Sequence, residues 1–330
     1  MKIEAFSEGK YLDDPEANED QFLVLPGRGY AVIDGATDIT GRLYGGKRGG
    51  WLASQITMQG VADFLVGTMA RDWRPELMIE QISAMIRASY ARHDILDIAR
   101  GNPGCRFGAT LTLAADLGET FRFALIGDSG LRINGEEIFV NDTGLDLVTA
   151  SLRVQAYTLV NEAGGSLEER ARVGRAAAFY GAAKLHPDMQ PWLDETKRRL
   201  LYDRSLAWCR ARFPAVPEND VRLLLDSGVS GQAHFANNTA SPLSYAVLDG
   251  FEVPLPLVWV IDRPRAAIRS VELFTDGYFK PGASAAVADW EAAFADVERV
   301  DPEKIDPYPS VKGSAGRLRT DDRTVVIVHL

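Results

Sequence analysis

Residues 21–34 read QFLVLPGRGYAVID, two short apolar runs that are separated by Pro26-Gly27 and end at an aspartate. Two β-rich runs around a Pro-Gly pair predict a hairpin of strands 21–25 and 29–33. An apolar β-run also abuts aspartate in LIGDSG (125–130), in LFTDGY (273–278) and, in reverse order, in DDRTVVIV (321–328). The sequence therefore predicts several strands that carry carboxylates at their ends.

Strand and helix patterns divide the remaining chain into β-rich ends and a helical middle. Apolar periodicity predicts helices over 51–69, 75–99 and 283–297, and residues 142–215 show an Ala/Arg/Glu-rich helical pattern without strands. No linker rich in Ser, Gly or Pro cuts the chain, so we expect one domain over 1–330 with a variable, mostly helical insertion at about 142–240. Further strands are expected at 109–115, 120–126, 131–133, 243–248, 257–261, 271–275 and 324–329.

Composition excludes several classes of protein. The 330 residues hold 36 Lys+Arg and 46 Asp+Glu, a net charge of −10, which disfavours binding to nucleic acid and to anionic membranes. The longest apolar run, 253–261, is too short to span a bilayer, and the N-terminus lacks the pattern of a secretory signal. With only two cysteines, Cys105 and Cys209, we expect a cytoplasmic protein without a disulfide framework.

Carboxylates at adjoining strand ends predict a cation site. Crowded like charges raise one another's pKa unless cations lie between them. Oxygen ligands without clustered His or Cys suit hard ions such as Mg²⁺ or Mn²⁺. Two such ions together bind a phosphoryl group and activate a water molecule, so phosphate chemistry is the expected use of the site.

The order of these motifs resembles the metal-dependent protein phosphatases, the protein phosphatase 2C family, in its bacterial branch. This resemblance implies an α+β fold, a four-layer α/β/β/α sandwich of two antiparallel sheets flanked by helices. It also implies two ions, Mg²⁺ or Mn²⁺, and attack on phosphorus by a water activated between them. The motifs are NEDQF (18–22), VIDGATD (32–38), GATLTLA (108–114), ALIGDSG (124–130), LFTDGY (273–278) and DDRTVVIV (321–328).

By motif position, the resemblance implies a role for each acidic residue. Asp34 is the expected catalytic residue, which bridges both ions, and Glu19 with the Gly35 carbonyl binds one of them. Asp276 and Asp321 are the expected ligands of the other ion. A weaker third ion, or the support of coordinated water, is expected of Asp20, Asp128 and Asp322.

The chain departs from the family pattern at three places. Ala36 stands where eukaryotic members carry a His. Lys280 stands where a further Asp usually completes the third metal site, which puts the third ion in doubt. Lys280 is expected to pair with Asp276 or with phosphate. The family's phosphate-binding Arg is missing, and Lys10 or the basic residues of the glycine-rich loop replace it in our interpretation. These loop residues are Arg42, Lys47 and Arg48.

The expected function is hydrolysis of phosphate monoesters, with phosphoserine and phosphothreonine on a phosphorylated protein as the first substrate class. A small phosphorylated molecule is an alternative substrate, because the insertion at 142–240 is compatible with either. A catalytically degenerate binding or regulatory module on the same fold is the second alternative, motivated by Ala36, Lys280 and the missing Arg.

Overall fold

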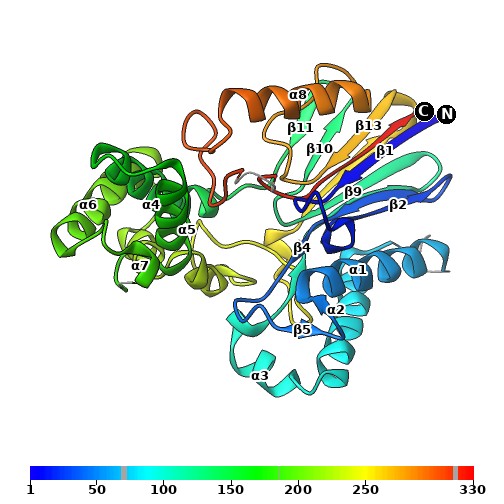
Figure 1. Ribbon diagram of the computed structural model, residues 1–330. Helices are drawn as coiled ribbons and strands as arrows, with labels where there is room; N and C mark the ends of the chain where they lie inside the picture. Colours follow the sequence, from blue (N-terminus) through cyan, green and yellow to red (C-terminus); the bar gives the residue numbers. More distant parts are fainter. Residues whose placement is uncertain (68–72, 185, 315–318) are drawn as a thin grey trace.

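Two five-stranded antiparallel sheets form the centre of the structure, a computed structural model that describes residues 1–67, 73–184, 186–314 and 319–330 (Figure 1). The predicted α+β fold of two antiparallel sheets flanked by helices is confirmed. The first sheet has the order β1 (Lys2–Glu8), β14 (Arg323–His329), β13 (Ser270–Phe274), β10 (Gly130–Ile133), β11 (Glu137–Phe139). The second has the order β12 (Trp259–Pro264), β9 (Thr120–Ile126), β8 (Leu111–Asp116), β3 (Gly29–Ile33), β2 (Gln21–Leu25).

The predicted hairpin is β2–β3, and its turn shows why Pro26-Gly27 is there. Gly27 has a φ of +73°, a left-handed conformation that glycine adopts without steric cost. Arg28 N–H donates to the Leu25 carbonyl at 2.9 Å and closes the turn. Two short ladders complete the strands: β4 (Gly35–Ala36) with β7 (Gly108–Ala109), and β5 (Leu43–Tyr44) with β6 (Lys47–Arg48).

Apolar side chains fill the space between the sheets. Tyr30 and Val32 from β3 share one cluster with Leu273 of β13 and Val326 of β14, and all four side chains are fully buried. Each such side chain contributes about 1.5–3 kcal/mol through its burial. This core fixes the two sheets relative to each other, and with them the loops at their ends.

Helices cover the outer face of each sheet (Figure 1). Phe64 and Ile82 pack with Leu113 beneath the second sheet, whereas Trp290 packs against Phe274 on the first, with ring centroids 4.8 Å apart. These helices are α1 (Gly49–Val66), α2 (Pro75–Arg92), α3 (Leu96–Gly101) and α8 (Val287–Val300). Short 3-10 helices lie at Pro15–Ala17, Pro103–Cys105, Pro187–Met189, Gly228–Phe235, Leu255–Leu257 and Arg265–Ala267.

The middle of the chain forms a helical group with its own core. Leu152, Val173, Leu201 and Leu224, one from each helix, are buried in a single cluster separate from the sandwich core. The helices expected within 142–215 are present, and a fourth follows them. They are α4 (Leu145–Glu162), α5 (Leu167–Tyr180), α6 (Glu195–Arg212) and α7 (Glu218–Ser227).

The structure differs from the sequence analysis in one strand that was missed and in two expected elements. The N-terminal strand β1 carries no clear apolar run, yet it pairs with β14 along its full length. The helix expected over 75–99 is two helices, because Asp94 adopts a left-handed φ of +54° and interrupts the helix between α2 and α3. The strand expected over 243–248 is wrong: this buried apolar segment makes only isolated bridges, such as Ala109 with Leu248.

The part of the chain that the structure describes contains no helix long and apolar enough to cross a membrane.

Gly130 tests the packing of the first sheet. It lies opposite Phe274 in the β10–β13 register, and a Cβ at Gly130 would lie 2.1 Å from the Phe274 ring, which Trp290 holds from the other side. We predict that Gly130→Ala lowers the free energy of unfolding by about 1–3 kcal/mol, measured by urea denaturation. The control is Gly101→Ala, where the Cβ meets no atom within 4 Å, and it should cause no loss. Equal stability of the two variants would contradict this account of the packing.

Candidate metal centre

Aspartates from four strand ends converge at one end of the sandwich. Asp34 follows β3, Asp128 lies between β9 and β10, Asp276 follows β13, and Asp321 precedes β14. Burial raises the pKa of Asp34 well above its ordinary value, and the charges of Asp276, Asp20, Asp321 and Asp128 raise it further. The structure therefore brings together the acidic residues that the sequence places far apart, with Asp34 among them.

The tightest acidic group includes a residue that the sequence did not suggest. One carboxylate oxygen from each of Asp128, Asp146 and Asp276 lies within 4.8 Å of the other two. Asp146 belongs to the first turn of α4, in the helical group, and the Gln232 amide donates to it at 2.6 Å. An aspartate in the first turn of a helix is common for electrostatic reasons alone, so no signal in the sequence distinguishes Asp146.

Asp20 supplies an observation that tests whether a cation fits this site. Its Oδ2 accepts a hydrogen bond from the Thr275 hydroxyl at 2.8 Å, whereas its Oδ1 is buried without a partner in the described part of the chain. Burial and the charge of Asp322 raise the pKa of Asp20 to about 7. A buried, unpartnered carboxylate oxygen is costly, and a hard cation or its coordinated water removes that cost. The donor set thus fits Mg²⁺ or Mn²⁺.

Glu19 lies beside a close approach of two glycines. The Thr37 hydroxyl donates to Glu19 Oε1, and Lys10 Nζ lies 3.2 Å from Oε2. A Cβ at Gly50 would lie 2.5 Å from Glu19 Oε1, and a Cβ at Gly35 would lie 2.3 Å from the Gly50 carbonyl oxygen. Both positions therefore require glycine, and this close packing holds Glu19 next to the chain that follows Asp34.

Two lysines enter the acidic region. Lys10 Nζ lies 2.9 Å from Asp322 and 3.5 Å from Asp321, in addition to its contact with Glu19. Lys312 Nζ donates to both oxygens of Asp321, at 2.6 and 2.8 Å. Burial alone raises the pKa of Asp321, but the ammonium groups of Lys312 and Lys10 outweigh it and hold the pKa below its ordinary value.

Asp322 organises the loop that carries Lys10. Its Oδ1 accepts the Lys10 backbone N–H at 2.7 Å, and its Oδ2 accepts the Glu19 backbone N–H at 3.3 Å as well as the Lys10 ammonium. Both oxygens are thus occupied by donors of the chain, which gives Asp322 a structural role beside the site.

The basic residues expected to bind phosphate lie around the β5–β6 hairpin. Lys47 pairs with Glu16 at 3.0 Å and its Nζ lies over the Trp51 ring, while Arg48 donates to the Tyr11 hydroxyl at 3.0 Å. Lys47 and Arg48 line a depression of about 360 Å³. Arg42 is not among its lining residues and lies over the Tyr44 ring. Lys280 pairs with Asp296 and not with Asp276, the carboxylate that the sequence suggested as its partner.

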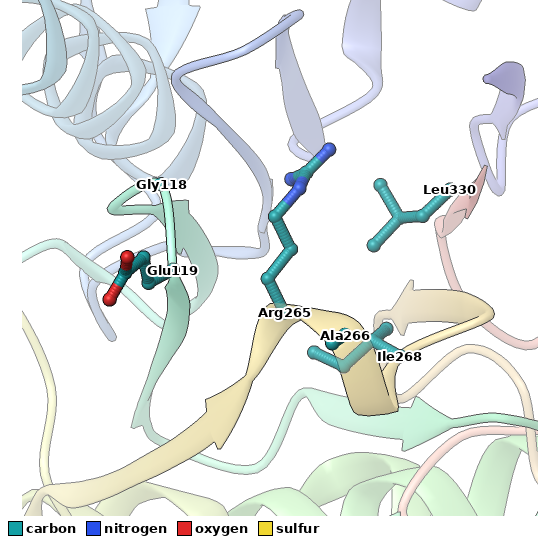
Figure 2. A pocket seen from close by; sticks show the side chains of 6 residues that line it. All are labelled: Gly118, Glu119, Arg265, Ala266, Ile268 and Leu330. Carbon is teal, nitrogen blue, oxygen red and sulfur yellow. The ribbon is translucent and has the colours of Figure 1, made fainter.

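A second cavity lies elsewhere and contains none of the expected site residues. It measures about 600 Å³ and is lined by Gly118, Glu119, Arg265, Ala266, Ile268 and Leu330. Figure 2 shows the Arg265 side chain rising between the Gly118-Glu119 turn and Leu330. Because Arg265 pairs with Asp116, its charge is already neutralised, and the cavity presents no comparable group of catalytic side chains. The convergence of carboxylates, and not this cavity, therefore locates the candidate site.

The crowding of carboxylates predicts a pH-dependent stability of the metal-free protein. Burial and the charge of Asp146 raise the pKa of Asp128 from 3.8 to about 7. A raised pKa means that ionisation opposes folding, so the cost grows from about pH 4 to pH 7 and is constant above. We predict that Asp128→Asn gains about 2–5 °C in Tm over the wild type between pH 5 and pH 8, measured in EDTA.

The matched control for this experiment is Asp262→Asn. Its hydrogen bonds with Arg122 lower the pKa of Asp262, so this substitution should show no pH trend between pH 5 and pH 8. A difference between Asp128→Asn and wild type that stays constant over this range would contradict the prediction.

Comparison with known proteins adds resemblances at the level of three-dimensional structure. No family model and no curated protein sequence matches the chain. The serine/threonine phosphatase PstP/Ppp of Mycobacterium tuberculosis is similar over 100% of this chain and 98% of its own, with 17% identity and a TM-score of 0.47. The serine/threonine phosphatase Stp1 of Staphylococcus aureus is similar over 100% and 95%, with 13% identity and a TM-score of 0.44. The catalytic domain of PstP, in complex with two manganese ions, is similar over 99% and 96%, with 15% identity and a TM-score of 0.44.

Proposed function

We propose that this chain is a metal-dependent phosphatase that hydrolyses phosphate monoesters, with phosphoserine and phosphothreonine of proteins as its first substrate class. The observation that carries the proposal is the convergence of Asp128, Asp276 and Asp321 on Asp34. The charges of these three residues raise the pKa of Asp34. These four residues come from motifs that follow one another in the order of the metal-dependent protein phosphatases. An acidic cluster alone has many explanations, whereas this order combined with this convergence favours one.

In this proposal two ions, Mg²⁺ or Mn²⁺, are held by oxygen ligands of the chain. Asp34 would hold both ions, Glu19 and the Gly35 carbonyl would hold one, and Asp276 and Asp321 would hold the other. When bound, the ions lower the pKa of a water molecule and neutralise charge on the phosphoryl group. Residues 1–330 form one domain in this proposal, and the segment 142–240 is its insertion.

The surrounding residues of the chain hold the ligands in place. The Thr37 hydroxyl fixes one oxygen of Glu19, and the Thr275 hydroxyl fixes one oxygen of Asp20. Asp146 brings a carboxylate from α4 to Asp128 and Asp276. It adds an acidic group to a site whose usual further Asp is replaced by Lys280 in the sequence. We propose that Asp128 and Asp146, with Asp276, support a weaker additional cation or ordered water.

Substrate phosphate needs positive charge at a protein of net charge −10. Lys10 and Lys312 bring two ammonium groups to the edge of the acidic cluster. Lys47 and Arg48, in the depression beside Tyr11 and Trp51, are our proposed contacts for phosphate or for the chain that flanks it; Arg42 is the weakest of the three because it does not line this depression. A small phosphorylated molecule stays the alternative substrate.

A degenerate binding module is the second candidate function, and one observation favours it. Asp321, a proposed ligand, is contacted by both Lys10 and Lys312. Calorimetric titration with Mn²⁺ separates the two functions, because a degenerate module should not bind the ion and a phosphatase should.

Hydrolysis of an aryl phosphate tests the proposed activity directly. We predict turnover of p-nitrophenyl phosphate that requires Mn²⁺ or Mg²⁺ and disappears in EDTA. Asp34→Asn should lower kcat by about 100-fold or more, since it removes a charge at the centre of the site.

Asp262→Asn serves as the control, because Asp262 is a surface residue paired with Arg122 on β9 and should leave turnover unchanged. Absence of metal-stimulated turnover, or equal turnover in Asp34→Asn and wild type, would rule out the proposed activity.

A further inference from the structure

Lys10 occupies an unusual place for a lysine. Its side chain is only 13% exposed, and its ammonium group lies 2.9 Å from Asp322, 3.2 Å from Glu19 and 3.5 Å from Asp321. An ammonium group has three N–H donors, so these three carboxylates account for all of them. Lys10 therefore acts as a cation inside the acidic cluster.

Two of these three carboxylates belong to the proposed ligand set, and they belong to different ions. Glu19 is the proposed ligand of one ion and Asp321 of the other. A carboxylate oxygen that faces an ammonium group at these distances is not free to approach a divalent cation, because the two positive charges repel each other. Lys10 and the metal ions thus compete for the same oxygens.

The third carboxylate differs from the other two. Asp322 is not a proposed ligand, and it also accepts the backbone N–H groups of Lys10 and Glu19. The Lys10 carbonyl in turn accepts the Arg319 backbone N–H at 2.9 Å. The backbone of Lys10 is therefore held from both sides, whereas its long side chain keeps a carboxylate partner in Asp322 when the other two are taken.

We propose that Lys10 is an exchangeable counter-ion of the metal centre. It neutralises Glu19 and Asp321 while the centre lacks metal, and it leaves them when divalent ions bind. The inference rests on the metal centre of the proposed function. In this inference Lys10 lowers the affinity of the centre for divalent ions. The protein then binds these ions only where their concentration is high enough to displace the Lys10 ammonium group.

Lys312 contacts the same cluster in a different way. Within the part of the chain that the structure describes, Lys312 forms an ion pair with Asp321 but with neither Glu19 nor Asp322. About half of its side chain is exposed. Its competition with metal is limited to one ligand of one ion, which makes Lys10 the more informative residue to change.

Calorimetric titration of the full chain with Mn²⁺ tests the exchange. We expect Lys10→Met to bind Mn²⁺ about tenfold more tightly than wild type, because the competing cation is gone. In EDTA the same variant should have a lower Tm than wild type, because three carboxylates lose their neutralising partner. Lys2→Met is the matched control: it removes the same charge at the far end of β1, where Lys2 is 70% exposed, and should change the affinity less than twofold.

A crystal structure of the wild-type protein with bound Mn²⁺ gives a second measurement that does not depend on the folding of a variant. The Lys10 ammonium should then be beyond hydrogen-bond distance of Glu19 and Asp321. If it stays within 3.5 Å of both, the distances that the structure shows, the exchange is wrong.

The outcomes separate this inference from the proposed activity. Unchanged Mn²⁺ affinity in Lys10→Met, with metal-dependent hydrolysis in the wild type, overturns the exchange and leaves the phosphatase proposal standing. Tighter binding in Lys10→Met without hydrolysis in any variant supports the exchange and contradicts the phosphatase. Failure of every folded variant to bind Mn²⁺ contradicts both.

Discussion

Repulsion among carboxylates at one end of the sandwich is the constraint on which the arrangement of this protein depends. Asp34, which is half-buried, experiences the charges of Asp20, Asp128, Asp276 and Asp321, and these charges raise its pKa. The strands that carry these residues cannot separate, because Tyr30, Val326 and their neighbours bind the two sheets through a buried apolar core. The apolar core thus holds in place a charge arrangement that is unfavourable by itself, which is typical of a functional site.

Much of the fold follows from short local signals. The hairpin β2–β3 is visible in the sequence because Gly27 is needed at the turn. β13 is visible as a largely apolar run, and β14 as a run of β-branched residues. β1 is hidden, because an edge strand with one face exposed carries as many polar as apolar residues. The buried connection 243–248 shows the opposite error, since burial makes a segment apolar whether or not it joins a sheet.

The candidate site was predictable to the extent that its residues sit at strand ends. Asp34, Asp128, Asp276 and Asp321 share the pattern of an apolar run that abuts aspartate, and the structure brings them together. Asp146 and Lys312 share no such pattern, because they reach the site from a helix and from a loop whose positions are set by tertiary contacts. Lys10 is visible in the sequence as a basic residue near Glu19, but its contacts with Asp321 and Asp322 are not, since both lie more than 300 residues away.

The helical group is linked to the acidic centre through two residues of α4 with opposite effects. Asp146 adds a negative charge beside Asp128 and Asp276. Arg153, two turns further along α4, donates to the Glu303 and Lys304 carbonyls and packs against Gly313, next to Lys312. The helix α4 therefore positions the carboxylate of Asp146 and also contacts the loop that carries Lys312, whose ammonium group neutralises Asp321. The helical group therefore contributes to the charge balance of the acidic centre through α4.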